Sequence, residues 1–393
     1  MARSRTVLIA GAGIGGLTAA LAVAQKGFRV VVVEQAERLE ETGAGIQLSP
    51  NATRVLSALG VADRLASVVV APDAVRVRSY RGRDIARLPL GATAQRRYGA
   101  PYWVVHRGDL QAALVGAVRG NGDITLKLGS RAEDFAVHAK GVTLELRTAA
   151  GAQDEHGIAL IAADGLWSAA RARVGDAGTP QFACRTAWRA LLPAKVLVPE
   201  FRENVVSLFL GPDTHLVLYP VKAGEAINVV AIVHDDWHRP GWSTAGRPEE
   251  LLAHYAQWPS KVRNLLGLPD RWLKWALYDR PRLQRWSKGP VTLLGDAAHP
   301  MLPFMAQGAA MAIEDAYVLA EHLGEAPDNP AAAFRKYQRR RRKRTARVQR
   351  TARQNSRVYH LKGAFAWLRN LGLRARGGGS LLRRYDWLYG WKP

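Results

Sequence analysis

Cysteine is almost absent from this 393-residue sequence, which contains only Cys184. A single cysteine excludes an internal disulfide bond and a cysteine-ligated metal cluster, so we expect no metal site. A chain of this kind suits a reducing compartment, and we expect it to be cytoplasmic. Cys184 itself is expected to be a small buried hydrophobic side chain rather than a redox group.

Long hydrophobic runs are also missing, since no apolar stretch reaches the ~20 residues that a membrane-spanning helix needs. The largely apolar segment Thr6–Ala24 follows Arg3 and Arg5, as the core of a secretory signal would. However, four glycines interrupt that segment, and a second apolar run, Val30–Val33, ends on Glu34. A strand, a glycine turn, a helix and a second strand explain this pattern better than a signal peptide.

Acidic residues are scarce only at the C-terminal end. Residues 331–393 hold 19 Lys and Arg and one acid, Asp386, whereas residues 1–330 hold 37 basic and 32 acidic residues. The run Arg339–Arg344 would by itself indicate binding to nucleic acid or to an anionic membrane. Little aromatic interleaving accompanies it, and no nucleic-acid-binding fold is recognisable. We therefore expect no nucleic-acid partner, and membrane contact is disfavoured.

Hydrophobic periodicity predicts an α/β chain, α+β overall, that opens with a β-α-β unit and continues through a glycine-rich loop at Thr42–Asn51. Short β-runs between about residues 179 and 288 indicate an inserted antiparallel sheet. Residues 330–371 are expected to be helical with an interruption at Gly363, and Gly377–Gly379 is expected to be a flexible hinge. The expected division is a discontinuous Rossmann-like nucleotide-binding domain (1–70, 101–178, 289–330), a substrate domain (71–100, 179–288) and a basic C-terminal helical segment (331–393).

The N-terminal unit carries a dinucleotide fingerprint, with glycines at 11, 13, 15 and 16 and with Glu34 and Gln35 at the end of the second strand. The glycines permit a tight turn and close approach of a pyrophosphate to a helix N-terminus, and Glu34 is placed to hold a ribose. This motif alone does not separate NAD from FAD. A second fingerprint is absent, because Gly43-Ala44-Gly45 lacks a third glycine and a β-α-β frame.

Two further motifs follow strands. Asp164-Gly165-Leu166-Trp167-Ser168-Ala169-Ala170-Arg171 begins with a tight turn that carries a carboxylate. The segment from Gly295 to Asp315 runs from a buried strand through Gly295-Asp296 and a proline-bearing loop into a helix that begins near Gly308. It therefore combines a carboxylate at a strand end with the unpaired N–H groups of a helix N-terminus, which suits a ligand with hydroxyls and developing negative charge.

These three motifs, in this order, resemble those of the FAD-dependent aromatic hydroxylases, the p-hydroxybenzoate hydroxylase superfamily. The second motif matches the family's Asp-Gly-x-x-Ser-x-x-Arg pattern, and His106-Arg107-Gly108-Asp109-Leu110 matches its His-Arg-x-Asp-Leu. Within the superfamily, the sequence resembles the salicylate hydroxylase and 3-hydroxybenzoate 6-hydroxylase branch. The segments that carry this finer resemblance are residues 43–51, 210–221, 347–349, 359–361 and 385–389.

The resemblance implies FAD as the cofactor and assigns roles around it. Asp296 would hydrogen bond a ribityl hydroxyl, and the amides of Gly308, Ala309 and Ala310 would face the pyrimidine edge of the flavin, where a helix N-terminus stabilises negative charge. Ala310 departs from the family, in which Asn is frequent at that position, so a side-chain contact is in doubt there. Gly45 and Arg107 would contact FAD, Asp164 would serve both FAD and the pyridine nucleotide, and His299 would be structural.

The implied reaction uses NAD(P)H to reduce FAD, and the reduced flavin captures O₂ as a C4a-hydroperoxide that hydroxylates a phenolic aromatic acid. A histidine suits activation of the phenol, because its pKa lies near working pH. The family motifs nominate His215 as base or orienter and Gln307 as orienter, with Tyr219 on the same strand face as His215. Tyr102 is a weaker candidate.

The sequence leaves other functions open. One alternative is a flavin monooxygenase that acts on a hydroxylated pyridine or a polycyclic substrate. The other is a non-catalytic flavoprotein whose basic tail binds membrane or nucleic acid. In the resembling enzymes an arginine-rich helix packs on the FAD domain, which favours a solvated or interface role for the basic run. A homodimer also stays open.

Overall fold

The computed structural model describes residues 5–39, 44–175, 178–239, 241 and 244–393. Its first layer is a six-stranded sheet with five parallel strands and one antiparallel edge strand. In spatial order the strands are β18 (Ser287–Lys288), β19 (Val291–Leu293), β11 (Ala159–Ala162), β1 (Thr6–Ala10), β2 (Arg29–Val33) and β7 (Ile124–Lys127). The apolar runs in the sequence mark its central strands because parallel strands are buried on both faces.

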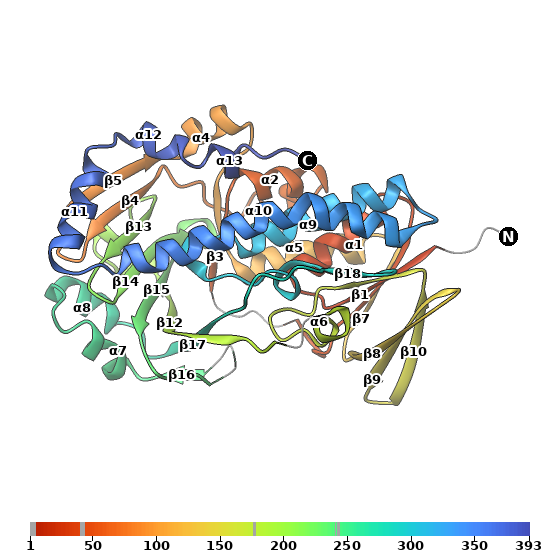
Figure 1. Ribbon diagram of the computed structural model, residues 1–393. Coiled ribbons are helices and arrows are strands. Elements are labelled where there is room, and N and C mark those ends of the chain that lie inside the picture. Colours follow the sequence, from red (N-terminus) through yellow and green to blue (C-terminus); the bar gives the residue numbers. More distant parts are fainter. Residues whose placement is uncertain (1–4, 40–43, 176–177, 240, 242–243) are drawn as a thin grey trace.

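The N-terminal β-α-β unit is present, with α1 (Ile14–Ala24) between β1 and β2. Helix α1 is apolar and buried almost all round because it packs against both α5 (Arg107–Arg119) and α9 (Gly308–Glu325). These helices lie beside the parallel sheet in Figure 1. The sheet and its helices together hold the larger part of the hydrophobic core.

A separate three-stranded antiparallel sheet stands at one end of the molecule (Figure 1). It consists of β8 (Arg131–His138), β9 (Gly141–Thr148) and β10 (Gly151–Gly157). Strand β10 was not expected from the sequence, because its residues are polar and mostly exposed.

An eight-stranded sheet forms the second layer, with one parallel pair, β13 and β4, among antiparallel neighbours. In spatial order its strands are β16 (Thr244–Gly246), β17 (Trp272–Asp279), β12 (Gln181–Pro193), β15 (Ala226–His234), β14 (His215–Val221), β13 (Val205–Leu210), β4 (Ala74–Ser79) and β5 (Asp84–Pro89). Helices α7 (Pro248–His254) and α8 (Ser260–Leu266) contribute to the apolar core on one face of this sheet, together with Trp188 and Trp272. The other face is left for the cavity described below.

The expected glycine-rich loop at Thr42–Asn51 is wrong for the part of it that the structure describes. Residues 45–48 form β3 (Gly45–Leu48), which pairs with β6 (Trp103–His106), and α2 (Pro50–Ala58) begins directly afterwards. The strand was missed because its partner is distant in the sequence. Residues 42 and 43 lie outside the described residues. Other short helices are α3 (Ala62–Leu65), α4 (Gly91–Tyr98), α6 (Ala169–Val174), and the 3₁₀ turns η1 (Ala194–Val196), η2 (Pro199–Phe201), η3 (Lys222–Gly224), η4 (Gly295–Ala297) and η5 (Pro303–Met305).

The C-terminal segment begins with the 30-residue α10 (Pro330–Tyr359), which packs along α9 and runs from the parallel-sheet side to the eight-stranded sheet (Figure 1). The chain then forms α11 (Gly363–Arg374), α12 (Gly378–Arg383) and α13 (Asp386–Tyr389). The hinge expected at Gly377–Gly379 is wrong, because Gly377 caps α12 and a Cβ on Gly378 would stand 2.1 Å from the carbonyl oxygen of Arg87. Close packing on β5, rather than flexibility, explains a glycine there.

The basic run lies on α10 and is partly buried. Arg341 and Arg344 form ion pairs with Glu314 of α9, and Arg341 also pairs with Asp315. This helix therefore packs on α9 beside the parallel sheet, and part of its charge is neutralised inside the protein. Helix α11, in contrast, leaves four large apolar side chains exposed: Phe365, Trp367, Leu368 and Leu371.

Cys184 is exposed, so the expectation of a buried thiol is wrong. It lies in β12 at φ 51°, where the register with β17 shifts between Phe182 and Thr186, and this bulge turns the residue out of the sheet's regular alternation. Among the described residues, no group of three or more His, Cys, Asp or Glu is placed to hold a metal ion. None of the helices within the described ranges is long and apolar enough to cross a membrane.

Candidate active site

A cavity of about 730 Å³ is lined by residues of both the parallel sheet and the eight-stranded sheet. Its volume lies in the range of small-molecule and cofactor sites. Most of the residues nominated from the sequence line it: Gly11, Gly13, Gly15, Glu34, Gln35, Gly45, Arg107, Asp164, His215, Tyr219, Asp296, Gln307, Gly308 and Ala309. Gly16, Ala310 and Tyr102 do not.

One end of the cavity is the glycine turn between β1 and α1. A Cβ on Gly16 would stand 1.9 Å from the carbonyl oxygen of Gly11, so Gly16 is needed for the turn to close and not for contact with a ligand. At Gly13, by contrast, no described atom lies within 4 Å of such a Cβ, and the turn is open toward the cavity. Glu34 holds the turn, because its Oε2 accepts a hydrogen bond of 2.8 Å from the Ala12 amide.

The Asp164 turn and the Asp296 loop are tied together by Arg171. Ser168 caps α6 by accepting the Arg171 amide at 3.0 Å, and the buried Arg171 guanidinium donates to the carbonyl oxygens of Ala297 and Ala298 at 2.9 and 3.0 Å. The Asp-Gly-x-x-Ser-x-x-Arg pattern thus has a physical reason that the sequence alone does not reveal: its arginine fixes the loop after Asp296. Burial raises the pKa of Asp164, whose Oδ1 has no hydrogen-bond partner among the described residues.

The N-terminus of α9 faces the middle of the cavity. The first backbone bond of the helix joins the Met311 amide to the Gln307 carbonyl, so the amides of residues 308–310 precede the helical ladder. Ala310 is fully buried and does not line the cavity, whereas Gly308 and Ala309 do. Across the cavity, Arg107 is positioned by the β6–α5 junction, where its amide donates to the Ala44 carbonyl at 2.8 Å.

Two charged groups face each other near this helix. Burial raises the pKa of Asp296 from its usual value, opposed by the charges of His299 and Arg107. Burial likewise lowers the pKa of Arg107, opposed by the charge of Asp296. His299 does not line the cavity and instead forms a hydrogen bond with the buried Asp315, as expected of a structural residue.

Gln307 lies just before α9, and its side chain is already engaged. Its Nε2 donates to the Ser49 hydroxyl at 2.8 Å, and its Oε1 accepts from the Asn51 amide at 3.3 Å. Asn51 in turn donates to Glu314 at 2.6 Å, and Glu314 pairs with the arginines of α10. The C-terminal helix is therefore connected to Gln307 through a buried polar network that the sequence did not reveal.

The opposite wall is the face of the eight-stranded sheet. His215 and Tyr219 lie two pleats apart on β14, and both line the cavity, as their spacing predicts. Gly45 closes this wall, because a Cβ there would stand 2.5 Å from the Tyr219 ring. Tyr102 lies outside the cavity and donates a hydrogen bond of 2.7 Å to Gln47, which does line it.

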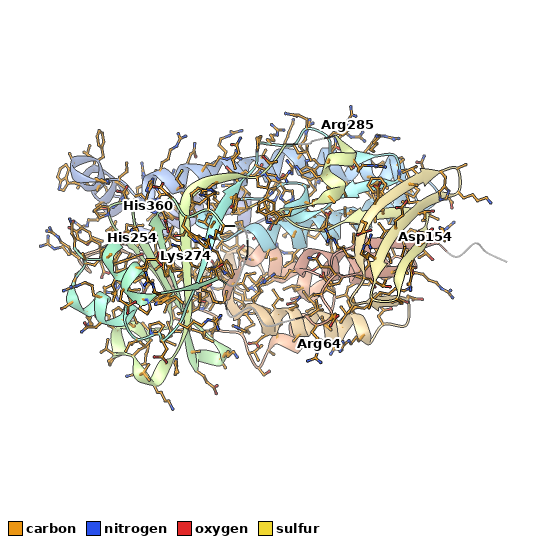
Figure 2. All side chains as sticks on the ribbon, turned by 90° about the horizontal axis from the view of Figure 1, so that it is seen from below. Arg64, Asp154, His254, Lys274, Arg285 and His360 are labelled. Atoms are coloured by element: carbon orange, nitrogen blue, oxygen red, sulfur yellow. The ribbon has the colours of Figure 1, made fainter. Side chains whose placement is uncertain are left out.

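A chain of three groups fixes the proton on His215. The Ser356 carbonyl oxygen can only accept, so Nδ1 of His360, at 2.5 Å, carries a proton and its Nε2 is an acceptor. Nδ1 of His215 lies 2.8 Å from that acceptor and therefore carries the other proton. The ring lines the cavity with Nε2 as the acceptor nitrogen. Figure 2 marks His360 at the eight-stranded-sheet end of the molecule, far from Asp154 on β10.

Burial keeps both histidines neutral. It lowers the pKa of His215 well below its usual value, and repulsion from His360 in its protonated form and from the charge of Arg185 lowers it further. Burial also lowers the pKa of His360 to about 4. The sequence did not nominate two residues of this site: His360, which bonds His215, and Arg189, which lines the cavity. His360 falls in residues 359–361, which resemble the hydroxylase branch but were given no role. Arg189 lies in β12, a strand that the sequence pattern did not predict.

The site fits FAD on its own features. The glycine turn is open at Gly13, Asp164 has an unpartnered buried oxygen, and Asp296 and the α9 N-terminus stand where a polyol and an anionic ring edge can be bound. Such an arrangement can hold a dinucleotide along the parallel sheet and place an aromatic substrate against His215.

Comparisons with known proteins agree with this geometry. Residues 4–352 match the family described as FAD binding domain. The chain is 38% identical to 3-hydroxybenzoate 6-hydroxylase of Polaromonas naphthalenivorans (strain CJ2) over 392 residues, which covers 98% of this chain and 96% of that protein. Klebsiella pneumoniae HpxO complexed with FAD and uric acid has a TM-score of 0.87 at 26% identity, covering 99% of this chain and 97% of that chain. A salicylate hydroxylase substrate complex has a TM-score of 0.82 at 27% identity, covering 99% and 96%. The chain therefore belongs to the FAD-binding family of aromatic hydroxylases and is an FAD-dependent monooxygenase with NAD(P)H as co-substrate.

Proposed function

We propose that this protein hydroxylates a phenolic aromatic acid of the hydroxybenzoate or salicylate type. The observation that carries the proposal is the proton arrangement on His215, which presents an acceptor nitrogen on the wall of the cavity. The relatives named for 3-hydroxybenzoate and salicylate support the same substrate class. In the net reaction the substrate, O₂, NAD(P)H and a proton give the hydroxylated substrate, water and NAD(P)⁺.

His215 would accept the phenol proton. FAD, when bound and reduced by NAD(P)H, supplies the activated oxygen, and the ring must be electron-rich to receive it. Because burial holds His215 neutral, its Nε2 can accept a proton or a strong hydrogen bond from the substrate hydroxyl. Phe304 and Tyr359 pack against the imidazole with ring centroids 5.5 Å away, which orients it.

Gln307 and Tyr219 would orient the same substrate. The bond from Gln307 to Ser49 uses one of the two hydrogens on Nε2, so the other can be donated to a substrate oxygen. Burial raises the pKa of Tyr219, so its hydroxyl stays protonated and can donate as well. In this assignment His215 moves the proton, while Gln307 and Tyr219 fix where the ring lies.

The cofactor would run from the glycine turn to the α9 N-terminus. Glu34 and Gln35 would hold the adenosine ribose end, and Arg107, Asp164 and Asp296 would contact the middle of FAD. The amides of residues 308–310 would face the flavin ring, and Gly16 would act only by shaping the turn. The division into a nucleotide-binding domain (1–70, 101–178, 289–330) and a substrate domain (71–100, 179–288) stays a proposal. The strands of the eight-stranded sheet all fall within the second, whereas β18 of the parallel sheet lies just inside its 179–288 range.

The test is NAD(P)H oxidation by the purified yellow protein across hydroxybenzoates, salicylate and hydroxynicotinates, with the products identified by mass spectrometry. We expect a hydroxybenzoate to stimulate oxidation and to gain one oxygen. A His215→Asn variant should keep its FAD and lose hydroxylation by roughly 10²–10⁴-fold. A panel without stimulation or product would refute the substrate class. A colourless protein that cannot be reconstituted with FAD would refute the wider assignment.

A further inference from the structure

Arg189 brings a positive charge to the substrate wall of the cavity. On β12 it stands opposite Val230 of β15, which stands opposite Val217 of β14, so all three share one face of the sheet. Val217 lies between His215 and Tyr219 on β14, and all of these residues line the cavity. Two strand spacings separate the backbones of Arg189 and Val217 by about 10 Å, which leaves room for one aromatic ring between Arg189 and His215.

Within the part of the chain that the structure describes, the guanidinium of Arg189 has no anion to neutralise it. No acid among the described residues forms an ion pair with it, and its buried Nε has no hydrogen-bond partner there. Its described contact is with the Trp275 ring, whose centroid lies 4.0 Å from Cζ. Three buried arginines of this protein are satisfied differently: Arg341 pairs with two carboxylates, Arg78 pairs with Glu200, and Arg171 donates to backbone carbonyls.

Burial lowers the pKa of Arg189 to about 10, with the nearby charge of Arg107 acting in the same direction. The group is therefore still charged near neutral pH. Arg189 is half-buried and lines the cavity. A positive charge held largely out of water without a counter-ion is costly, so a site of this kind is completed by an anionic ligand.

The position of Arg189 selects among the anions that this protein binds. The pyrophosphate of a dinucleotide belongs at the glycine turn on the parallel sheet, at the other end of the cavity. Arg107, the neighbouring cavity arginine, has Asp296 as its counter-charge. Arg189 stands on the opposite sheet, beside an aromatic ring and across from the proton acceptor. A planar carboxylate on an aromatic ring matches a guanidinium fork in this position.

We propose that Arg189 binds the carboxylate of the aromatic substrate, which holds the ring between the guanidinium and His215. The proposal rests on the proposed function for the substrate class and adds the group that makes the site specific for acids. Trp275 would hold the guanidinium plane in place and cover the ring edge. Phenols that lack the acid would then bind weakly, because they cover the half-buried cation and leave it unpaired.

The test measures binding to the FAD-containing protein through ligand-induced changes in the flavin absorbance spectrum. The probes are two matched pairs, 3-hydroxybenzoate with 3-hydroxybenzamide and salicylate with salicylamide. We expect the wild type to bind the better acid at least tenfold more tightly than its amide. Arg189→Met should weaken binding of that acid roughly 10- to 100-fold and should change binding of the amide less than about threefold. Arg189→Lys keeps the charge but loses the guanidinium fork, so its affinity for the acid should lie between those of the wild type and Arg189→Met.

Arg87→Met is the matched control. It removes one positive charge from β5 of the same sheet, at an exposed side chain that does not line the cavity. It should leave the acid-to-amide preference within about threefold of the wild type. FAD content and Tm are recorded for every variant, and Arg189→Lys replaces Arg189→Met if the latter fails to fold.

Two outcomes would overturn the inference. One is a wild-type protein that binds acid and amide equally, and the other is an Arg189 variant that weakens both ligands by the same factor. The proposed function fails differently. A wild type that prefers the acids but forms no hydroxylated product would refute the hydroxylation of this class while leaving the carboxylate site standing.

Discussion

Nδ1 of His215 lies 2.8 Å from Nε2 of His360, so a residue at the end of the C-terminal helix α10 determines which nitrogen of the cavity histidine carries its proton. The backbone carbonyl of Ser356 closes this chain and gives it a direction. A neutral histidine can exist as two tautomers, and only one of them offers Nε2 as the acceptor. The C-terminal segment is thus a positioning element for the cavity as well as a cover for α9.

Replacing His360 should impair hydroxylation without removing substrate or FAD binding. His360→Leu deletes the acceptor for the His215 proton, and we expect kcat to fall roughly tenfold because the wrong tautomer becomes populated. His360→Gln can place an amide oxygen near the lost Nε2 and should recover much of that activity. The measurement is kcat and the fraction of NAD(P)H oxidation coupled to product. Equal losses in the two variants would show that His360 acts only through packing.

Activity should persist on the acid side of the usual histidine range. Burial lowers the pKa of His215 below 6.5, and the neutral form is the one that accepts a proton. The kcat at saturating substrate should therefore be flat near pH 6.5 and fall only at lower pH.

The same pKa shifts affect folding stability. Because His215 and His360 titrate below their unfolded values, the unfolded state binds more protons in this window, and stability declines as pH falls from about 6.5 toward the His360 pKa of about 4.

This pH dependence can be measured as the acid limb of kcat, with Tm recorded over the same range. His360→Gln should reduce the loss of Tm between pH 6.5 and 4 because it removes one of the titrating groups. An acid limb centred above pH 6.5 would contradict a neutral buried His215.

The ion pairs between α10 and α9 should dominate the stability of the C-terminal segment. Burial alone would raise the pKa of Asp315, but the charges and hydrogen bonds of His299 and Arg341 outweigh it and hold that pKa at about 2. Arg341→Met would leave Glu314 and Asp315 buried with less compensation and should cost about 3–5 kcal/mol of unfolding free energy. Arg340→Met changes an exposed residue of the same helix and should stay within about 0.5 kcal/mol. Urea unfolding of the two variants gives the comparison, and similar free energies would contradict this account.

Local patterns predicted the parts of this protein that depend on neighbours in sequence. The glycine turn, the Asp164 turn and the α9 N-terminus each lie within one strand–loop–helix unit, and turn and capping chemistry identifies them. Arg189 and His360 depend on pairings between distant segments, since β12 carries the first and the end of α10 brings the second against β14. No periodicity in the sequence records those contacts. The exposure of Cys184 was missed for the same reason, because a bulge between two paired strands decides it.

Two glycines of the first turn should separate folding from cofactor binding. A Cβ on Gly16 meets the Gly11 carbonyl oxygen at 1.9 Å, so Gly16→Ala must displace the backbone of the turn. We expect it to lower both the Tm of the FAD-free protein and the affinity for FAD. Gly13 has φ −70°, which alanine adopts freely, and a Cβ there projects into open space among the described residues.

Gly13→Ala should therefore keep the Tm of the FAD-free protein within about 1–2 °C while weakening FAD by at least tenfold, because the added methyl stands where the pyrophosphate approaches the turn. Titrating FAD-free protein with FAD and following the quenching of flavin fluorescence measures the affinity, and thermal unfolding gives Tm. If Gly13→Ala bound FAD as tightly as the wild type, the pyrophosphate would not lie over this turn. If it lowered Tm as much as Gly16→Ala, the open space at Gly13 would be structural and not a place for the cofactor.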